Sequence, residues 1–173
     1  MNTMPTTNFS TCDMCDARLE DTDGRFRVLP PLFQSFGGLQ AFAGAVSTVQ
    51  CLDDNSLVRA ALTEPGQGRV LIVDGGGVMR RALVGGNLAV LGERNGWSGI
   101  VVYGCVRDVA ELNAAQVGIR ALALNPMPTL KKGQGLRDVP VQIQGVWVRP
   151  GDWLYADADG MVVYDQPIDL DKP

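Results

Sequence analysis

The sequence of 173 residues contains no histidine. Imidazole is the general base of Ser-His-Asp and Cys-His sites and a principal zinc ligand, so such nucleophilic sites, HExxH hydrolases and three-histidine zinc aldolases are excluded. Lysine is also scarce, because only Lys131, Lys132 and Lys172 stand against twelve arginines. None of the three falls in an apolar stretch typical of a buried strand, which disfavours an imine-forming aldolase. Catalysis must therefore rely on carboxylates, arginine, hydroxyls, thiols or metal-bound water.

Long apolar runs and an excess of basic residues are absent as well. No run approaches the roughly 18 residues of a membrane span, and the first residues, MNTMPTTNFST, lack the basic and apolar regions of a signal peptide. The net charge is −4, and acidic and basic residues are interspersed rather than gathered in a stripe. We therefore expect a cytoplasmic protein with no membrane contact and no direct nucleic-acid binding. Any link to RNA metabolism would pass through a protein partner.

The four cysteines are Cys12, Cys15, Cys51 and Cys105. Cys12 and Cys15 form a CxxC pair, which is compatible with a redox pair or with half of a zinc site. Residues 12–19 are predicted to form a helix, which places the two thiols at i and i+3 on one face, and the other two cysteines stand singly in apolar runs. We interpret all four as reduced structural thiols.

Composition and hydrophobic pattern favour one α/β domain over residues 11–173, preceded by a flexible tail at 1–10. Val70–Val73 and Ile100–Tyr103 are apolar without alternation, as expected of strands that are buried on both faces. The remaining elements predicted for this part are strands at 45–50 and 119–124 and helices at 56–62, 88–94 and 108–116. The repeated strand, helix, strand order indicates a parallel central sheet.

The last third of the chain has a different pattern. Residues 125–137 are rich in proline, glycine and lysine and predict a loop. Strands are then predicted at 139–148, 153–155 and 161–164, with the turn sequences RPGD and DADG between them. Antiparallel strands therefore follow the parallel centre.

Gly85, Gly86, Asn87 and Leu88 lie where a strand gives way to the predicted helix at 88–94. Free N–H groups and the helix dipole favour an anion at such a terminus, and paired glycines let a carboxylate approach the backbone closely. An ordinary glycine turn with Asn87 as helix cap is the alternative. In the same way, the Asp53-Asp54-Asn55 triplet before the helix at 56–62 is interpreted as a set of helix caps.

Arg107 and Asp108 follow the next strand, with twenty residues between Gly86 and Arg107. That span lets a helix and a strand return to the same sheet edge, so both segments would face one crevice. An arginine can bind a carboxylate through two parallel hydrogen bonds, and an aspartate can hold a hard cation or its waters. Glu111, on the same helix face as Asp108, could hold a metal-bound water. The pair suggests a small anionic substrate, whereas the simpler alternative is a helix cap beside a surface charge.

The glycine triplet at 75–77 follows a strand and resembles a nucleotide-binding turn. It fits neither pattern, because Arg80 stands where the dinucleotide fingerprint needs its third glycine and no Gly-Lys-Ser/Thr sequence follows. We expect these glycines to let the backbone pass close to another segment or subunit. The alternative is that Arg80 and Arg81 bind an anion near this turn.

Three segments resemble the RraA-like family in their residues and in their order: DGGGVMRRALVGGNLA, NGWSGIVVYGCVRDV and VRPGDWLYADADGMVV. The resemblance covers nearly the whole chain and implies a swivelling β/β/α fold. That family includes divalent-metal-dependent aldolases that cleave 4-hydroxy-4-methyl-2-oxoglutarate to pyruvate, some of which also decarboxylate oxaloacetate. It also includes regulators of ribonuclease E activity. The resemblance further implies a ring-shaped homo-oligomer, for which we expect a trimer.

By this resemblance, residues 85–88 form a backbone cradle for substrate, Arg107 binds substrate and Asp108 binds Mg²⁺ or Mn²⁺. Metal-binding members commonly carry aspartate where this chain has Gly86, and the C-terminal extension that supplies an extra acid in longer aldolases does not follow Pro173. Members known for regulation can lose the aspartate of the Arg-Asp pair, which is retained here. We expect a metal-dependent lyase acting on a small 2-oxo acid. The alternative is a non-catalytic regulator that binds ribonuclease E or an RNA helicase partner.

Overall fold

A parallel four-stranded sheet forms the centre of the computed structural model, which describes residues 8–170. In spatial order its strands are β3 (Phe42–Gln50), β4 (Val70–Asp74), β6 (Gly99–Val106) and β7 (Gly118–Leu124). β3 pairs in parallel with β4, β4 with β6, and β6 with β7. The parallel centre predicted from the sequence is therefore confirmed.

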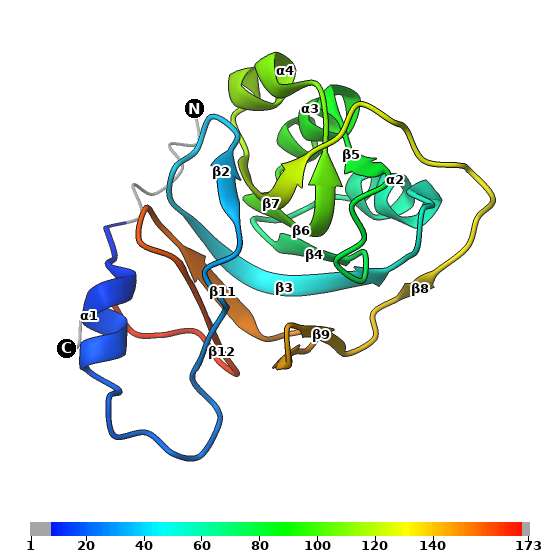
Figure 1. Ribbon diagram of the computed structural model, residues 1–173. Coiled ribbons are helices and arrows are strands. Elements are labelled where there is room, and N and C mark those ends of the chain that lie inside the picture. Colours follow the sequence, from blue (N-terminus) through cyan, green and yellow to red (C-terminus); the bar gives the residue numbers. More distant parts are fainter. Residues whose placement is uncertain (1–7, 171–173) are drawn as a thin grey trace.

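Antiparallel strands extend this sheet on both sides (Figure 1). Those beyond β3 are β11 (Trp153–Ala156), β12 (Met161–Tyr164) and β1 (Arg27–Val28), and the strand beyond β7 is β2 (Gln34–Phe36). Two short strands lie off this path, namely β5 (Ala82–Val84), which runs parallel to β6, and β8 (Leu136–Arg137), which pairs with β3. The predicted C-terminal antiparallel strands are thus present.

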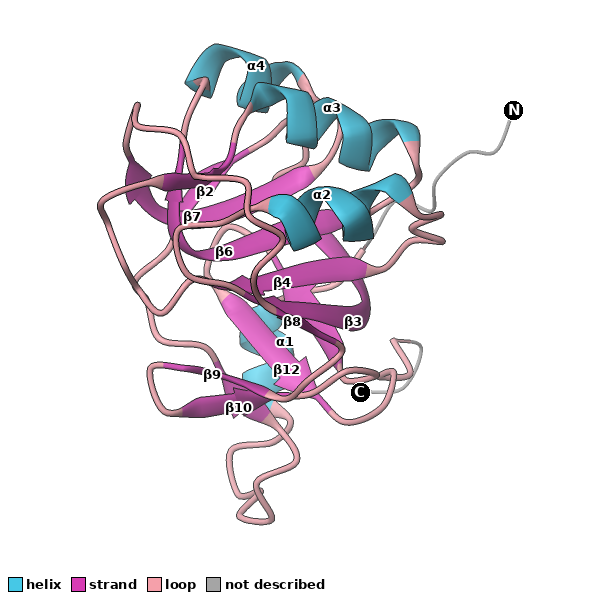
Figure 2. Ribbon diagram, turned by 90° about the vertical axis from the view of Figure 1, so that its right-hand side faces the viewer, coloured by secondary structure: helices cyan, strands magenta, loops and turns pink. Residues whose placement is uncertain are grey.

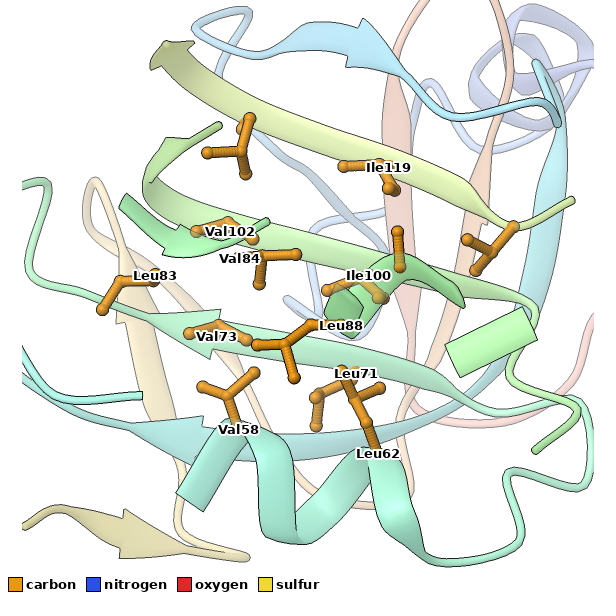
Figure 3. Packing of buried hydrophobic residues seen from close by; sticks show 14 of the residues in the cluster. Val58, Leu62, Leu71, Val73, Leu83, Val84, Leu88, Ile100, Val102 and Ile119 are labelled. Carbon is orange, nitrogen blue, oxygen red and sulfur yellow. The ribbon is translucent and has the colours of Figure 1, made fainter. Parts of the chain in front are cut away.

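Three of the four helices in the described part of the chain cover one face of the sheet (Figure 2). They are α2 (Ser56–Thr63), α3 (Gly86–Arg94) and α4 (Val109–Ala114). Val58 and Leu62 of α2 and Leu88 of α3 are buried and face the strands (Figure 3). The remaining helix, α1 (Thr11–Asp16), lies apart, with its Met14 packed against β11 and β12.

Alternation along the central strands divides the core into two layers. In β4, Leu71 and Val73 belong to the cluster under the helices, whereas Val70 and Ile72 belong to the cluster on the opposite face. That second face is covered by a separate two-stranded hairpin of β9 (Val141–Ile143) and β10 (Val146–Val148) together with residues of β11 and β12. Because both faces are covered, the strands lack the apolar-polar alternation of a surface sheet.

Several sequence-based boundaries were wrong. The strand predicted at 139–148 is the β9–β10 hairpin, which turns at Gln144 and Gly145 with φ of 47° and 84°. A two-residue turn of this hand favours Asn-Gly or Asp-Gly, so glutamine in the first position concealed it. The helix predicted at 12–19 ends at Asp16, and the loop predicted at 125–137 ends in β8.

The N-terminal prediction is tested only in part. Residues 1–7 of the expected flexible tail lie outside the described residues, whereas the Ser10 side chain accepts a hydrogen bond from the amide of Asp13 and caps α1. No helix within residues 8–170 is long and apolar enough to cross a membrane.

Candidate functional site

A pocket of about 90 Å³ lies where β5 and β6 end. It brings together five of the seven residues that the sequence singled out: Gly85, Asn87, Leu88, Arg107 and Asp108. The other residues that line it are Ala82 and a facing group made up of Asn55, Arg59, Pro128, Thr129 and Lys131. We call the first group the glycine wall and the facing group the loop wall. Gly86 and Glu111 stand directly behind the glycine wall rather than on the pocket surface.

The glycine wall begins at the turn from β5 into α3. Gly85 is extended, with φ of −126° and ψ of −174°, and its carbonyl accepts hydrogen bonds from the amides of Leu88 and Ala89. The amide of Gly86 donates to Oδ2 of Asp108 at 3.0 Å. The amides of Gly86, Leu88 and Ala89 thus have partners within the chain, whereas the amide of Asn87 is left for a ligand. Fewer free backbone amides are therefore available to a substrate at this turn than the sequence predicted.

Asp108 has a strained backbone. Its φ is 62° and its ψ is 53°, in the left-handed region that residues other than glycine rarely adopt. It occupies the N-cap position of α4, but its side chain makes no capping hydrogen bond and reaches Gly86 instead. The interpretation of Asp108 as a simple helix cap is therefore wrong. Strain of this kind is found where a side chain must be aimed at a particular place.

Arg107 is held in position by its backbone and by part of its side chain. Its amide donates to the Val84 carbonyl at 3.0 Å, which ties the end of β6 to β5. Its Nη1 donates to the Pro126 carbonyl at 3.2 Å, and its Nε lies 3.6 Å from Oδ2 of Asp108. Both side chains of this ion pair are more than one-third exposed, so the pair adds little stability. The guanidinium has five donor hydrogens, and most of them stay free for a ligand.

Gly85 and Gly86 make room for two carboxylates. A Cβ atom on Gly85 would lie 2.6 Å from Oδ2 of Asp108, and one on Gly86 would lie 2.5 Å from Oε2 of Glu111 and 2.6 Å from its Cβ. The carboxylate of Glu111 therefore occupies the space that a side chain at position 86 would fill. This contact could not be predicted from the sequence, because Gly86 and Glu111 lie on different helices.

The donor set fits a hydrated divalent cation better than an enclosed metal ion. Among residues 8–170 no group of three or more cysteines or acidic residues is arranged to hold a metal. Asp108 uses Oδ2 for the Gly86 amide, which leaves Oδ1 for a cation, and the Glu111 carboxylate also lies against Gly86. Mg²⁺ is usually bound by one or two carboxylates together with waters and substrate oxygens, so this pair suffices.

The loop wall was missed by sequence reasoning. Asn55 was interpreted as a helix cap, but its side chain does not cap α2 and its Nδ2 donates to the Leu83 carbonyl at 3.1 Å. Thr129 and Lys131 come from the segment after β7, which was predicted only as a loop. That segment is yellow in Figure 1 and forms bridges from Pro128 to Ala82 and from Leu130 to Asp54. Because this segment is rich in proline and glycine, it has no hydrophobic periodicity from which a helix or strand could be predicted.

Two polar atoms of the loop wall are buried without a partner. Oδ1 of Asn55 and Oγ1 of Thr129 have no hydrogen-bond partner within the described chain, and Thr129 is only 7% exposed. A buried polar atom without a partner costs roughly 1 to 3 kcal/mol. Arg59, Arg107 and Lys131 also line the pocket, against the single acid Asp108. The pocket therefore suits an anion that also supplies hydrogen-bonding groups.

The glycine triplet has the structural role expected of it. The amides of Gly75 and Gly77 donate to the carbonyl of Tyr103, and a Cβ on Gly75 would lie 2.8 Å from that carbonyl oxygen. Arg80 pairs with Asp53 at 2.6 Å. Arg81 donates to the Pro128 carbonyl at 2.7 Å and so braces the loop wall.

The CxxC pair lies far from this chemistry. Cys12 is exposed and Cys15 is partly buried on α1, and both are free thiols. The neighbouring carboxylate of Asp159 is the main reason why the pKa of Cys12 is raised above its usual value. A raised thiol pKa disfavours the reactive thiolate.

Two larger hollows lack the convergent groups of the small pocket. One of about 430 Å³ lies between α1 and residues 168–170, and one of about 370 Å³ lies beside the ends of β3 and β4. In the second hollow, the buried Asp74 accepts hydrogen bonds from Gly76 and Gln50, so its carboxylate has partners within the chain. Volume alone is therefore a poor guide to the site here.

Comparison with known proteins gives a consistent family but several activities. The RraA-like family model, described as Aldolase/RraA, matches residues 11–163. A protein of Albidiferax ferrireducens named "Putative 4-hydroxy-4-methyl-2-oxoglutarate aldolase" is 58% identical over 166 residues, which are 91% of this chain and 96% of that protein. A protein of the same name from Cupriavidus necator is 56% identical, over 90% of this chain and 95% of the relative.

Solved structures share the fold under different names. The RNA-processing inhibitor RraA from Thermus thermophilis superposes with a TM-score of 0.87 at 46% identity, over 92% of this chain and 94% of its own. A Geobacillus kaustophilus structure described as an S-adenosylmethionine:2-dimethylmenaquinone methyltransferase gives 0.86 at 41% identity, over 92% and 97% of the two chains. One fold therefore carries three different functional names, and function has to be argued from the pocket.

Proposed function

The chain belongs to the RraA-like family, and from that premise we propose that it is a carbon–carbon lyase that releases pyruvate from a small 2-oxo acid. The substrates we propose are 4-hydroxy-4-methyl-2-oxoglutarate, by retro-aldol cleavage, and oxaloacetate, by decarboxylation. The single observation that carries this proposal is the convergence of Arg107, Asp108 and the free Asn87 amide on one cationic pocket. Both reactions develop negative charge on the 2-oxo oxygen, so both need donors fixed in advance at that point.

The glycine wall would bind the 2-oxo acid end of the substrate. The Asn87 amide and the N-terminus of α3 would take the carboxylate next to the oxo group, because a helix N-terminus favours an anion. The guanidinium of Arg107 would donate to the 2-oxo oxygen, where its fork can hold the oxygen as charge develops. The Pro126 and Asp108 contacts keep that fork aimed at the pocket.

We propose that Asp108 holds Mg²⁺ or Mn²⁺ through its free Oδ1 and that Glu111 holds a water beside it. When bound, the cation would supply a positive centre at the 2-oxo oxygen and the adjacent carboxylate. The strained backbone of Asp108 and the hydrogen bond from Gly86 fix the direction of its carboxylate. Glu111 would contribute from α4 the carboxylate that Gly86 cannot.

The bond changes balance without an outside oxidant or reductant. In retro-aldol cleavage the bond between C3 and C4 breaks, its electron pair passes to the 2-oxo oxygen, and the C4 hydroxyl loses a proton. One pyruvate forms from C4, and the enolate of the other takes a proton at C3. In decarboxylation of oxaloacetate the same electron pair is left as carbon dioxide departs, and no hydroxyl proton moves. The chain has no histidine, so a water held near Asp108 and Glu111 would accept the hydroxyl proton.

A pyruvate-release assay tests this proposal directly. Both substrates would be supplied with Mg²⁺ and, separately, with the metal removed by a chelator. We expect pyruvate release well above the rate given by Mg²⁺ alone, and loss of that release on chelation. Release at the metal-only rate from both substrates would contradict the lyase.

Exposed apolar side chains near the pocket support assembly of several copies. Those at the end of β7 and on the segments that follow β3, β4 and β7 are Leu52, Met79, Leu124, Met127 and Leu130. Exposed large apolar side chains are common at contact surfaces, and closed rings are common among homo-oligomers. We propose a ring-shaped trimer, and sedimentation showing an 18.5 kDa monomer at micromolar concentration would contradict it.

One observation favours a second function, which is regulation of RNA processing. The Thermus thermophilis structure that shares this fold is described as an RNA-processing inhibitor. Such a role would use an outer surface to bind ribonuclease E or an RNA helicase and needs no pocket chemistry. Inhibition of RNA cleavage by purified ribonuclease E, retained in Arg107→Ala, would support it. Absence of inhibition at a large molar excess would contradict it.

A further inference from the structure

Asp54 is a buried acid that the lyase chemistry does not use. It is 1% exposed and lies between the end of β3 and the start of α2. Its Oδ1 accepts a hydrogen bond from the Ser56 amide at 2.8 Å. Its Oδ2 accepts from the amides of Lys132 at 2.6 Å and Gln134 at 3.2 Å. One carboxylate therefore joins the first turn of α2 to the long loop after β7.

Both segments joined by Asp54 carry residues of the loop wall. Asn55 follows it directly, and Arg59 lies one turn further along α2. Thr129 and Lys131 lie just before the amides that Asp54 accepts. The Asp54 carboxylate thus helps to set the position of one half of the loop wall relative to the other.

Two further hydrogen bonds beside Asp54 serve the same junction. The Leu130 amide donates to the Asp53 carbonyl at 3.1 Å, and the Gly133 amide donates to Oγ of Ser56 at 3.1 Å. Burial opposes the ionised form of Asp54, but hydrogen bonds from Ser56, Lys132 and Gln134 outweigh it and lower its pKa to about 2. The carboxylate is therefore ionised at neutral pH, and both of its oxygens act as acceptors.

We propose that Asp54 is a positioning residue for substrate selection, which sets Thr129 and Lys131 against Asn55 and Arg59 so that the loop wall binds a second anionic group of the substrate. This inference rests on the proposed function for the assignment of the first group, the 2-oxo acid, to the glycine wall.

The chemistry of the loop wall determines the class of that second group. Lys131 and Arg59 bring two cationic side chains to this side of the pocket, and the hydroxyl of Thr129 is buried without a partner. A carboxylate accepts from all three. The unpaired Oδ1 of Asn55 needs a donor, which a water beside a bound carboxylate would supply. A 2-oxo acid with a second carboxylate thus fits both walls, whereas pyruvate fits only the glycine wall.

Binding of two unreactive probes by titration calorimetry tests this division. Pyruvate carries the 2-oxo acid group alone, and 2-oxoglutarate carries the same group with a second carboxylate. We expect the wild-type protein to bind 2-oxoglutarate about tenfold more tightly than pyruvate, in keeping with one added charge-assisted contact. In Asp54→Asn the two dissociation constants should become nearly equal while that for pyruvate stays within about twofold of its wild-type value.

Asparagine is the informative substitution because it keeps the shape of the side chain. Its amide nitrogen would face the donor hydrogens of Lys132 and Gln134, or, if flipped, that of Ser56, so one side of the junction must separate. Asp53→Asn is the matched control. The Asp53 side chain pairs with Arg80 outside the pocket, so we expect an unchanged ratio of the two constants.

Ser56→Ala keeps the test decisive if Asp54→Asn fails to fold. It removes the hydroxyl that accepts from Gly133 and that also hydrogen-bonds the Asp54 carboxylate, while it keeps the Ser56 amide, so it should reduce the preference in the same direction but less. The proposal is overturned if wild type shows no preference for 2-oxoglutarate. It is also overturned if a folded Asp54→Asn protein keeps that preference, or if both probes weaken equally. A preference for 2-oxoglutarate without pyruvate release from either substrate would contradict the proposed lyase activity but not the role of Asp54.

Discussion

The two walls of the pocket are built in opposite ways. The glycine wall follows the ends of two paired strands, and its charged residues are held by backbone hydrogen bonds between β5, β6 and α3. The loop wall joins a helix start to a long irregular segment and depends on the buried carboxylate of Asp54. A sheet edge tolerates the loss of one side chain, whereas a junction in which one acid accepts three backbone hydrogen bonds is more sensitive to the loss of that acid. We therefore expect substitutions in the glycine wall to change the rate and substitutions in the loop wall to change selectivity.

The largest effect expected in this comparison is the loss of Arg107. Arg107→Ala should lower kcat/KM for pyruvate release about a hundredfold or more, because a donor aimed at a developing oxyanion is worth roughly 3 kcal/mol. The measurement is steady-state pyruvate release from oxaloacetate. Arg94→Ala, at the far exposed end of α3, is the control and should match wild type. A fall of the same size in both variants would mean that charge in general, rather than the Arg107 fork, is responsible.

Loss of the Asp108 charge should have the next largest effect. Asp108→Asn keeps a residue that tolerates the left-handed backbone and removes the carboxylate charge. We expect the dependence of the rate on Mg²⁺ to disappear, with a fall of about tenfold or more at saturating metal. Titration of Mn²⁺ followed by its paramagnetic effect on water relaxation should show weakened binding even without substrate. Unchanged Mn²⁺ binding would show that the cation binds at a site other than Asp108.

The third effect concerns the close packing of Gly86 against the Glu111 side chain behind the glycine wall. Gly86→Asp should lower the free energy of unfolding by about 1 to 3 kcal/mol, because its Cβ would meet the Glu111 side chain. Glu111→Gly removes the obstacle, so the cost of Gly86→Asp should be smaller in that background. Denaturant unfolding of the two single variants and the double variant measures this coupling. Additive costs would show that the two positions do not share space.

Much of the fold and half of the pocket could be predicted from the sequence, for a physical reason. Gly85, Asn87 and Arg107 lie within a few residues of strand ends, and parallel strands bring such ends to one edge. The roles of Asn55 and Thr129 could not be predicted in this way, because a loop without periodicity reveals neither its path nor its partners. Asp54 was interpreted as a local cap and does accept the Ser56 amide, but its second oxygen bonds to residues about 80 positions away. Only the folded chain shows that contact.

The smallest effect concerns the pH at which the loop wall loses its support. The pKa of Asp54 is lowered from 3.8 to about 2, so its ionised form stabilises the folded state at every pH above the unfolded value near 3.8. That contribution is lost as the pH falls from about 4 to about 2, and it amounts to at most roughly 2 to 3 kcal/mol. Asp54→Asn lacks an ionisable group at this position. The difference in unfolding midpoint between wild type and Asp54→Asn, followed by circular dichroism, should be constant from pH 5 to pH 8 and should narrow below about pH 4. A difference that stays constant down to the acid limit of folding would mean that the Asp54 charge does not hold the junction together.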